Sequence, residues 1–264
     1  MQGLVEGKVV VITGAGSGVG RAACVLFAEH GAMVVAADVD NAAVEESAAL
    51  VKGNGGQAIA VRCDVTDAQS VAAAVAAAVD AFGRLDIMYN NAGITIRPEP
   101  GKPLKSFLDA TEADIDRLQA VNVKGVLYGC QAAIRQFDEQ GGGGVIVNTA
   151  SVAGLMGYGG VVYGATKGAI AIATRTIALE VAARGIRVNS VCPGGMPTNF
   201  IGVGMGAHAA VRQSMGNNHP LGRPVEPEEC ASAALFLASD MASNITGVNL
   251  PVDGGLCAGI SLAK

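Results

Sequence analysis

The chain has 264 residues, of which 50% are hydrophobic, and its 18 basic and 23 acidic residues give a net charge of -5. A chain of this length and apolar content can bury a large core, so an ordinary folded globule is expected. The acidic balance, without any basic run, disfavours nucleic acid as a partner.

Apolar runs such as Val9–Ile12 and Met33–Ala37 are far shorter than the roughly 20 residues that span a bilayer, so no transmembrane helix is predicted. The first residues, MQGLVEGK, lack a basic segment followed by a long apolar stretch, so we expect no secretory signal and a cytoplasmic protein. The six cysteines form no C-x-x-C pair and there are only three histidines, so reduced thiols and no metal site are expected.

Short β-branched segments alternate along the chain with longer Ala-rich segments of helical period, a pattern typical of β-α-β units on a parallel sheet. The predicted strands are Lys8–Thr13, Ala32–Ala37, Gln57–Cys63, Asp86–Tyr89, Gly144–Thr149, Ile186–Val191 and Gly247–Pro251. The predicted helices are Val19–His30, Asn41–Lys52, Asp67–Phe82, Thr111–Glu139, Val161–Arg184 and Pro227–Ala238. Because no linker divides the chain, we predict a single α/β domain over residues 1–264, a doubly wound parallel sheet with helices on both faces.

Two segments, Ile94–Ala110 and Pro193–Glu226, are longer than a connection needs. Both follow the ends of predicted strands, and open α/β sheets bind ligands at that edge. We therefore expect both to be substrate loops.

A glycine-rich turn, Thr13-Gly-Ala-Gly-Ser-Gly-Val-Gly20, joins the first strand to the first helix with the spacing T-G-x-x-x-G-x-G. Such a turn can present free N–H groups to a pyrophosphate, so Gly14, Ser17, Gly18 and Val19 are candidate contacts. A plain tight turn is the alternative for this motif alone, because its spacing is not the usual G-x-G-x-x-G.

Asp38 ends the second predicted strand, where a carboxylate can accept both hydroxyls of an adenosine ribose and repel a 2′-phosphate. Ser17 is neutral and Arg21 lies inside the first helix, so NAD is favoured over NADP. The alternative is that Asp38 caps the helix beginning at Asn41. Further candidate cofactor contacts follow the third and fourth strands, namely Asp64, Val65, Asn91, Ala92 and Gly93.

Tyr163 and Lys167 are four residues apart on a predicted helix and share one face. The ammonium, together with an oxidised nicotinamide, would lower the Tyr163 pKa and make the phenol an acid/base. Ser151, at the end of the fifth strand, can hold a substrate oxygen against that phenol, although serine is also a common turn residue. Asn122 is polar within an apolar stretch, which suits either a functional amide or a satisfied core amide.

With these residues in view, the sequence resembles the short-chain dehydrogenase/reductase family over almost its whole length. The motifs that carry the resemblance are T13-G-A-G-S-G-V-G20, Asp64, N90-N-A-G93, Asn122, Ser151, Y163-G-A-T-K167, N189-S-V-C-P-G194 and D253-G-G255. The resemblance implies a Rossmann-type fold and hydride transfer between a nicotinamide and a substrate carbon.

The resemblance further implies that Tyr163 is the acid/base, that Ser151 stabilises the substrate oxygen, and that Lys167 tunes Tyr163 and binds the nicotinamide ribose. It implies that Asn122 holds a water in a proton relay. The residues implied to fix the nicotinamide are Pro193, Gly194, Met196 and Thr198. The chain departs from the family at Ala150, often a serine, and at Pro197, which could alter how that loop closes.

The expected substrate wall is apolar and flexible, which suits a small neutral alcohol or ketone. Its members are Ile94, Leu155, Met156, Tyr158, Gly195, Met196, Phe200, Ile201, Met205 and Met215. Arg97 and Arg212 could meet an acidic substrate, but loop arginines are more often solvated.

The Ala-rich helices Thr111–Glu139 and Val161–Arg184 carry more apolar positions than the sheet needs, and residues 257–264 form a small apolar tail. We therefore expect a homo-oligomer, a dimer or a tetramer.

These residues together predict an NAD-dependent dehydrogenase of secondary alcohols, or the reverse ketone reductase. One alternative is an NADP-dependent reductase of 3-oxoacyl thioesters, which would need a cation near Asp38 and a basic patch for its carrier. Another is a non-catalytic dinucleotide-sensing protein, which has no need of Ser151, Tyr163 and Lys167.

Overall fold

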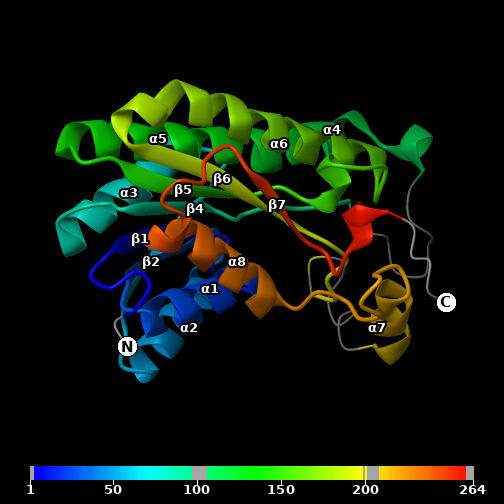
Figure 1. The fold of residues 1–264 in the computed structure, drawn as a ribbon, viewed down its shortest axis with the longest axis horizontal. Coiled ribbons are helices and arrows are strands. Elements are labelled where there is room, and N and C mark those ends of the chain that lie inside the picture. Colours follow the sequence, from blue (N-terminus) through cyan, green and yellow to red (C-terminus); the bar gives the residue numbers. More distant parts are fainter. Residues whose placement is uncertain (1–2, 97–105, 199, 201–207, 260–264) are drawn as a thin grey trace.

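The computed structural model describes residues 3–96, 106–198, 200 and 208–259 (Figure 1). Its seven strands form one sheet in the order β3-β2-β1-β4-β5-β6-β7, and every pair of neighbours is parallel. The strands are β1 Val9–Thr13, β2 Met33–Asp38, β3 Gln57–Arg62, β4 Ile87–Asn90, β5 Gly144–Thr149, β6 Ile186–Pro193 and β7 Asn249–Val252. The α-helices are α1 Gly18–Glu29, α2 Asn41–Gly53, α3 Ala68–Phe82, α4 Glu112–Leu118, α5 Gly125–Gln140, α6 Val161–Val181, α7 Ala209–Gly216 and α8 Pro227–Ala238.

The strand order predicts where the sheet forms a ligand-binding crevice. β1 lies between β2 and β4, so the direction of winding reverses there. In doubly wound sheets a crevice opens at such a reversal, outside the carboxyl ends of the strands. The predicted fold class, a doubly wound parallel α/β sheet, is confirmed.

Two apolar layers cover the sheet. On β1, Val10 and Ile12 face a core shared with α1, α2 and α8, whereas Val9 and Val11 face a core shared with α3, α5 and α6. Figure 1 shows α5 and α6 above the sheet and α1 and α8 below it. Because side chains alternate along a strand, a run of valine and isoleucine buries both faces at once.

Polar residues start several helices, as the sequence predicts. Asp67 caps α3, and Thr111 forms a capping box at α4. At α2 the capping residue is Asp40, whose side chain accepts the N–H of Ala43. The alternative that Asp38 caps this helix is therefore wrong.

The predicted helix Thr111–Glu139 is not continuous. α4 ends at Leu118, a π-helical segment follows over Gln119–Lys124, and α5 begins only then. Asn122 lies within that segment. Apolar spacing predicts a helix here but does not reveal one short π-helical segment, in which each N–H reaches the carbonyl five instead of four residues back.

The expected loop 193–226 contains α7, which is a second correction. Its sequence, AAVRQSMG, is short and has no sustained apolar stripe, so periodicity does not predict it. Residues 97–105 and 201–207 lie outside the described residues, and so do the expected contacts of Arg97, Ile201 and Met205.

Five of the six cysteines are buried, which confirms the expectation that most of them are packed in the interior. Across the described part of the chain, none of the helices combines the length and hydropathy that crossing a membrane requires.

Candidate active site

The glycine-rich turn after β1 leaves almost no room for side chains. A Cβ on Gly14, whose φ is +66°, would lie 2.8 Å from the Cα of Ala92, and one on Gly20 would lie 2.1 Å from the carbonyl oxygen of Gly14. Both positions therefore require glycine. Among the described residues, the nearest atom to a Cβ built on Gly18 is the Thr198 methyl carbon at 4.0 Å. The turn is thus tight at Gly14 and Gly20 and less crowded at Gly18.

Ser17 and the first turn of α1 follow directly on the glycine-rich turn. Ser17 is the exposed N-cap residue, and within the described part of the chain its hydroxyl makes no capping hydrogen bond. The first turn of α1, which includes Val19, holds no acidic residue, so the positive end of the helix is uncompensated. Such an uncovered N-terminus fits the pyrophosphate of a dinucleotide.

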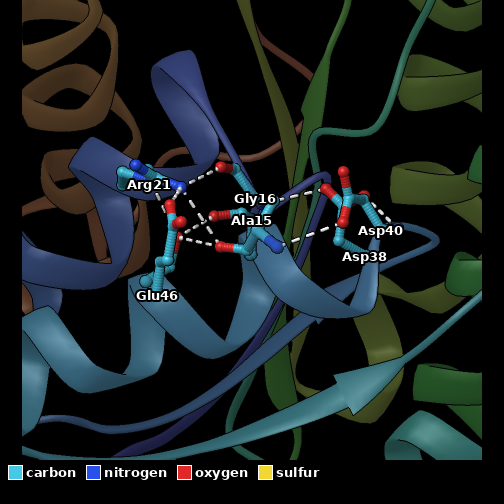
Figure 2. Close-up of polar contacts among 8 residues, drawn as sticks. Ala15, Gly16, Arg21, Asp38, Asp40 and Glu46 are labelled. Atoms are coloured by element: carbon cyan, nitrogen blue, oxygen red, sulfur yellow. Dashed lines mark hydrogen bonds and ion pairs between the residues drawn. The ribbon is translucent and has the colours of Figure 1, made fainter.

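Asp38 stands half-buried at the end of β2 and holds the glycine-rich turn. Its Oδ2 accepts the N–H of Gly16 at 2.8 Å, and its Oδ1 accepts the N–H of Asp40 at 3.0 Å. Figure 2 shows Asp38 on one side of Gly16 and Arg21 on the other. The carboxylate is therefore oriented by the backbone and is still partly exposed at the sheet edge.

Arg21 lies near this edge, but its guanidinium is already engaged (Figure 2). Its donors reach the carbonyl oxygens of Gly16 and Ala43, the hydroxyl of Ser47 and the carboxylate of Glu46 at 2.6–3.2 Å. Ser47 in turn donates to the carbonyl oxygen of Ala15 at 2.7 Å. These contacts brace the turn from the side opposite Asp38, so Arg21 is not poised to receive a 2′-phosphate.

Thr13 and Asn91 join the ends of β1 and β4. The Thr13 hydroxyl accepts the N–H groups of Asn91 and Ala92 at 3.0 and 3.1 Å. The Asn91 amide donates to the carbonyl oxygen of Thr13 at 3.0 Å and accepts from the Thr149 hydroxyl at 3.3 Å. The sequence-based candidates omit Thr13, although its place directly before Gly14 could have identified it.

Asp64 and Val65 follow β3. Hydrogen bonds from the hydroxyl and N–H of Thr66 hold the pKa of Asp64 below its usual value. Val65 packs against the start of α5, where a Cβ on Gly125 would lie 3.0 Å from the Val65 Cβ. Asp64 is therefore ionised at neutral pH, and its hydrogen bonds with Thr66 fix its orientation.

Ser151, Tyr163 and Lys167 come together at the end of β5. Ser151 precedes a short 3-10 turn, while Tyr163 and Lys167 share one side of α6. The Ser151 hydroxyl lies near enough to the Tyr163 phenol to lower its pKa, and the Nζ of Lys167 lies 5.8 Å from the centroid of the Tyr163 ring. Lys167 is buried and donates to the carbonyl oxygen of Thr149 at 2.7 Å. The arrangement can hold a substrate oxygen between two hydroxyls with a cation close by.

Burial dominates the ionisation of these groups. It raises the pKa of Tyr163 to about 12, and the nearby Ser151 hydroxyl offsets only part of that rise. It also lowers the pKa of Lys167 to about 8. The sequence predicts a lowered Tyr163 pKa from Lys167 and an oxidised nicotinamide together. The chain's own groups produce the opposite direction, because burial disfavours the phenolate.

Asn122 places its amide against Ile94. Its Oδ1 accepts the N–H of Ile94 at 2.8 Å, and its Nδ2 donates to the carbonyl oxygen of Ile94 at 2.9 Å and to the Thr166 hydroxyl at 3.1 Å. A Cβ on Gly93 would lie 3.4 Å from both the Asn122 Oδ1 and the Lys167 Nζ. Both Nδ2 protons of Asn122 are thus used, its Oδ1 accepts the N–H of Ile94, and the side chain lies near Lys167.

The segment from Pro193 to Thr198, at the end of β6, connects Ser151 to the glycine-rich turn. Ser151 donates to the carbonyl oxygen of Pro193 at 3.4 Å, and the N–H of Gly194 donates to Val252 of β7 at 2.9 Å. The N–H of Thr198 donates to the carbonyl oxygen of Met196 at 3.0 Å. Because the Thr198 methyl group lies opposite Gly18, this segment borders both ends of the candidate site.

Part of the expected substrate wall gathers around Tyr163. The Phe200 ring meets the Tyr163 ring edge-on, with centroids 5.8 Å apart. A Cβ on Gly195 would lie 3.1 Å from the Tyr158 hydroxyl oxygen and 3.7 Å from the Met215 Cβ. Leu155 and Met156, also expected in the wall, are exposed.

Arg212 of α7 forms an ion pair with Glu226, the residue before α8. Its charge is therefore compensated within the protein, which does not favour the alternative that Arg212 binds an acidic substrate.

A cavity of about 430 Å³ lies at the opposite, amino edge of the sheet, lined by Asp86, Gly143, Gly185 and Arg187 among others. None of the predicted site residues lines it. The candidate site is thus defined by its side chains at the carboxyl edge and not by the size of a cavity.

Comparisons with known proteins match this arrangement. A family model described as "Enoyl-(Acyl carrier protein) reductase" matches residues 14–257. The chain is 41% identical over 254 residues to meso-2,3-butanediol dehydrogenase of Serratia marcescens, covering 96% of each chain. It is 39% identical over 261 residues to 2,5-dichloro-2,5-cyclohexadiene-1,4-diol dehydrogenase LinX of Sphingobium indicum, covering 98% of this chain and 100% of that one.

A crystal structure of a short-chain type dehydrogenase/reductase from Mycobacterium marinum superposes with a TM-score of 0.84, at 34% identity and 96% coverage of both chains. The fold, the order of the motifs and these full-length relatives all indicate the same family. The chain belongs to the short-chain dehydrogenase/reductase family of Rossmann-fold oxidoreductases.

Proposed function

We propose that the protein is an NAD-dependent dehydrogenase of small, neutral secondary alcohols, with diols as the first candidates, in which Tyr163 is the general acid/base. The observation that carries the proposal is the cluster of Ser151, Tyr163 and Lys167 at the carboxyl edge of the sheet. Two full-length relatives named as diol dehydrogenases support the substrate class. The nicotinamide, when bound, supplies the hydride acceptor or donor.

Each side chain of the cluster then has a distinct task. Ser151 donates to the substrate oxygen and keeps it beside the phenol. Tyr163 takes the alcohol proton as hydride leaves carbon, or returns it in the reverse direction. Lys167, charged below a pKa of about 8, stabilises negative charge on Tyr163 and reaches toward the nicotinamide ribose. The proposed role of Asn122 in holding a water stays a prediction, since its amide is bound to Ile94 and Thr166.

The preference for NAD rests on two neighbouring observations. Asp38 presents a backbone-oriented carboxylate where the adenosine ribose would lie, and a 2′-phosphate there would meet a like charge. Arg21 is committed to the glycine-rich turn and Glu46. An NADP-dependent thioester reductase therefore has less support than a diol dehydrogenase.

The cofactor contacts that we propose are those that border the glycine-rich turn or the catalytic cluster. They are Gly14, Ser17, Gly18, Val19, Asp38, Asp64, Val65, Asn91, Ala92, Gly93, Tyr163, Lys167, Pro193, Gly194, Met196 and Thr198. We also propose that residues 1–264 act as one domain. A homo-oligomer is consistent with exposed Ile172 and Leu179 on α6.

The test is a turnover assay of the purified protein with NAD or NADP and meso-2,3-butanediol, 1,4-cyclohexanediol or a 3-hydroxyacyl thioester. Reduced-nicotinamide absorbance is followed in each mixture. We expect turnover of a diol, with kcat/KM for NAD exceeding that for NADP by at least about tenfold. Turnover of the thioester with NADP alone would overturn the proposal. Binding of NADH without turnover of any alcohol would favour a sensing protein.

A further inference from the structure

His219 is buried between α7 and the exit of β6, and both of its ring nitrogens are bonded to backbone. Its Nε2 lies 3.1 Å from the N–H of Gly195, and its Nδ1 lies 2.7 Å from the carbonyl oxygen of Met215. A backbone N–H can only donate, so Nε2 must carry a lone pair and Nδ1 the proton. The two partners together define one neutral tautomer and one ring orientation.

The segment that His219 holds also contacts the catalytic serine. The carbonyl oxygen of Pro193 accepts from Ser151, while the N–H of Gly194 is bonded to Val252 and the carbonyl oxygen of Gly195 to the N–H of Val225. The N–H of Gly195, two residues beyond Pro193, is bonded to the His219 side chain. Because only Gly194 separates the two residues, a shift of Gly195 would also move the Pro193 carbonyl oxygen that accepts the Ser151 hydroxyl.

The imidazole also fills the space against this segment. A Cβ on Gly194 would lie 2.6 Å from the His219 Nε2, and one on Gly195 would lie 3.1 Å from the His219 Cε1. Such close approach requires glycine at Gly194, where the distance of 2.6 Å is shorter than a side chain allows. The ring is thus packed directly on the backbone that it hydrogen-bonds.

We propose that His219 is a positioning residue that sets the Pro193–Met196 segment, and with it the Ser151 hydroxyl, while tying α7 to the same segment. The inference rests on the proposed function, because it assumes that this segment borders the nicotinamide. It predicts that the hydrogen bond to Gly195 matters for activity more than the hydrogen bond to Met215.

Two substitutions separate these hydrogen bonds. In His219→Gln the amide can reach the place of Nε2 and accept the N–H of Gly195, whereas the shorter side chain in His219→Asn can reach only the place of Nδ1 and donate to Met215. We expect kcat/KM within about threefold of the original protein for His219→Gln and a loss of about tenfold or more for His219→Asn, since an unpaired buried N–H is costly. His30→Gln, at the amino edge of the sheet, is the matched control and should leave kcat/KM unchanged.

Measurements on the unaltered protein keep the proposal testable if a variant fails to fold. Nitrogen-15 NMR should find the proton of the buried His219 ring on Nδ1, and a proton on Nε2 would overturn the proposal.

Equal losses of kcat/KM in His219→Gln and His219→Asn, or activity in His219→Asn equal to that of the original protein, would also overturn it. NADH titration by fluorescence needs no alcohol, so a weaker Kd in His219→Asn alone supports the positioning role even if every alcohol tested fails to react.

Discussion

Asp38 and Gly16 are joined across the sheet edge by a 2.8 Å hydrogen bond from the Gly16 N–H to the Asp38 Oδ2, although 22 residues separate them in sequence. The proposed ribose-binding carboxylate thus also holds the turn that would face the pyrophosphate. The carbonyl oxygen of the same glycine is bonded to Arg21, so the two sides of the turn are held by opposite charges.

Asp38→Ala should therefore reduce cofactor discrimination. We expect the ratio of kcat/KM for NAD to that for NADP to fall by about tenfold or more, because a like charge near the 2′-phosphate is removed. Asp40→Ala is the control, since Asp40 caps α2 and should cost only about 1 kcal/mol of stability without changing the ratio. If the NAD to NADP ratio of kcat/KM changed equally in Asp38→Ala and Asp40→Ala, Asp38 would not be the residue that contacts the adenosine ribose.

Tyr163→Phe should remove most turnover and leave NADH binding nearly intact. The hydroxyl is the only group of Tyr163 that this change deletes, and loss of a general acid/base costs about a hundredfold or more in kcat. Steady-state kinetics and NADH fluorescence titration measure the two effects. Tyr128→Phe on α5 makes the same chemical change away from the cluster and should retain activity. Substantial turnover by Tyr163→Phe would refute the assigned role.

Lys167→Met should abolish turnover and change how stability depends on pH. Burial lowers the folded-state pKa of Lys167 to about 8 from an ordinary value of 10.5. Between these two pKa values the unfolded chain binds more protons than the folded one, so the free energy of unfolding rises with pH. Below about pH 8 Lys167 is charged in both states, and the full cost of burying that charge lowers the stability. Urea unfolding of both proteins at about pH 7 and about pH 10 should show the original protein gaining stability relative to the variant. Parallel pH profiles would contradict the lowered pKa.

Gly20→Ala should weaken NADH binding and destabilise the protein. The new Cβ would lie 2.1 Å from the carbonyl oxygen of Gly14, so the turn must move, at a cost of about 1–3 kcal/mol. Gly53→Ala, at the exposed end of α2 with open space around it, makes the same change and should be neutral or stabilising by up to about 1 kcal/mol. Thermal unfolding with and without NADH compares the two variants. Equal Kd values for NADH in Gly20→Ala and Gly53→Ala would show that the glycine-rich turn does not contribute to cofactor binding.

The amino-acid sequence by itself determined the features that depend on local chemistry. Alternating apolar and Ala-rich segments predicted the strands and most helices, because side-chain periodicity reflects burial within each segment. The glycine-rich turn, Asp38 at a strand end, and the spacing of Tyr163 and Lys167 on one helix face could be located for the same reason.

Only the tertiary structure decided which partner each polar group takes. The engagement of Arg21, the hydrogen bonds of Asn122 within a π-helical segment, the helix α7 and the orientation of His219 all depend on contacts between residues far apart in the chain. A local pattern specifies which atoms can donate or accept, but the folded arrangement decides which of them meet and how burial shifts their pKa values.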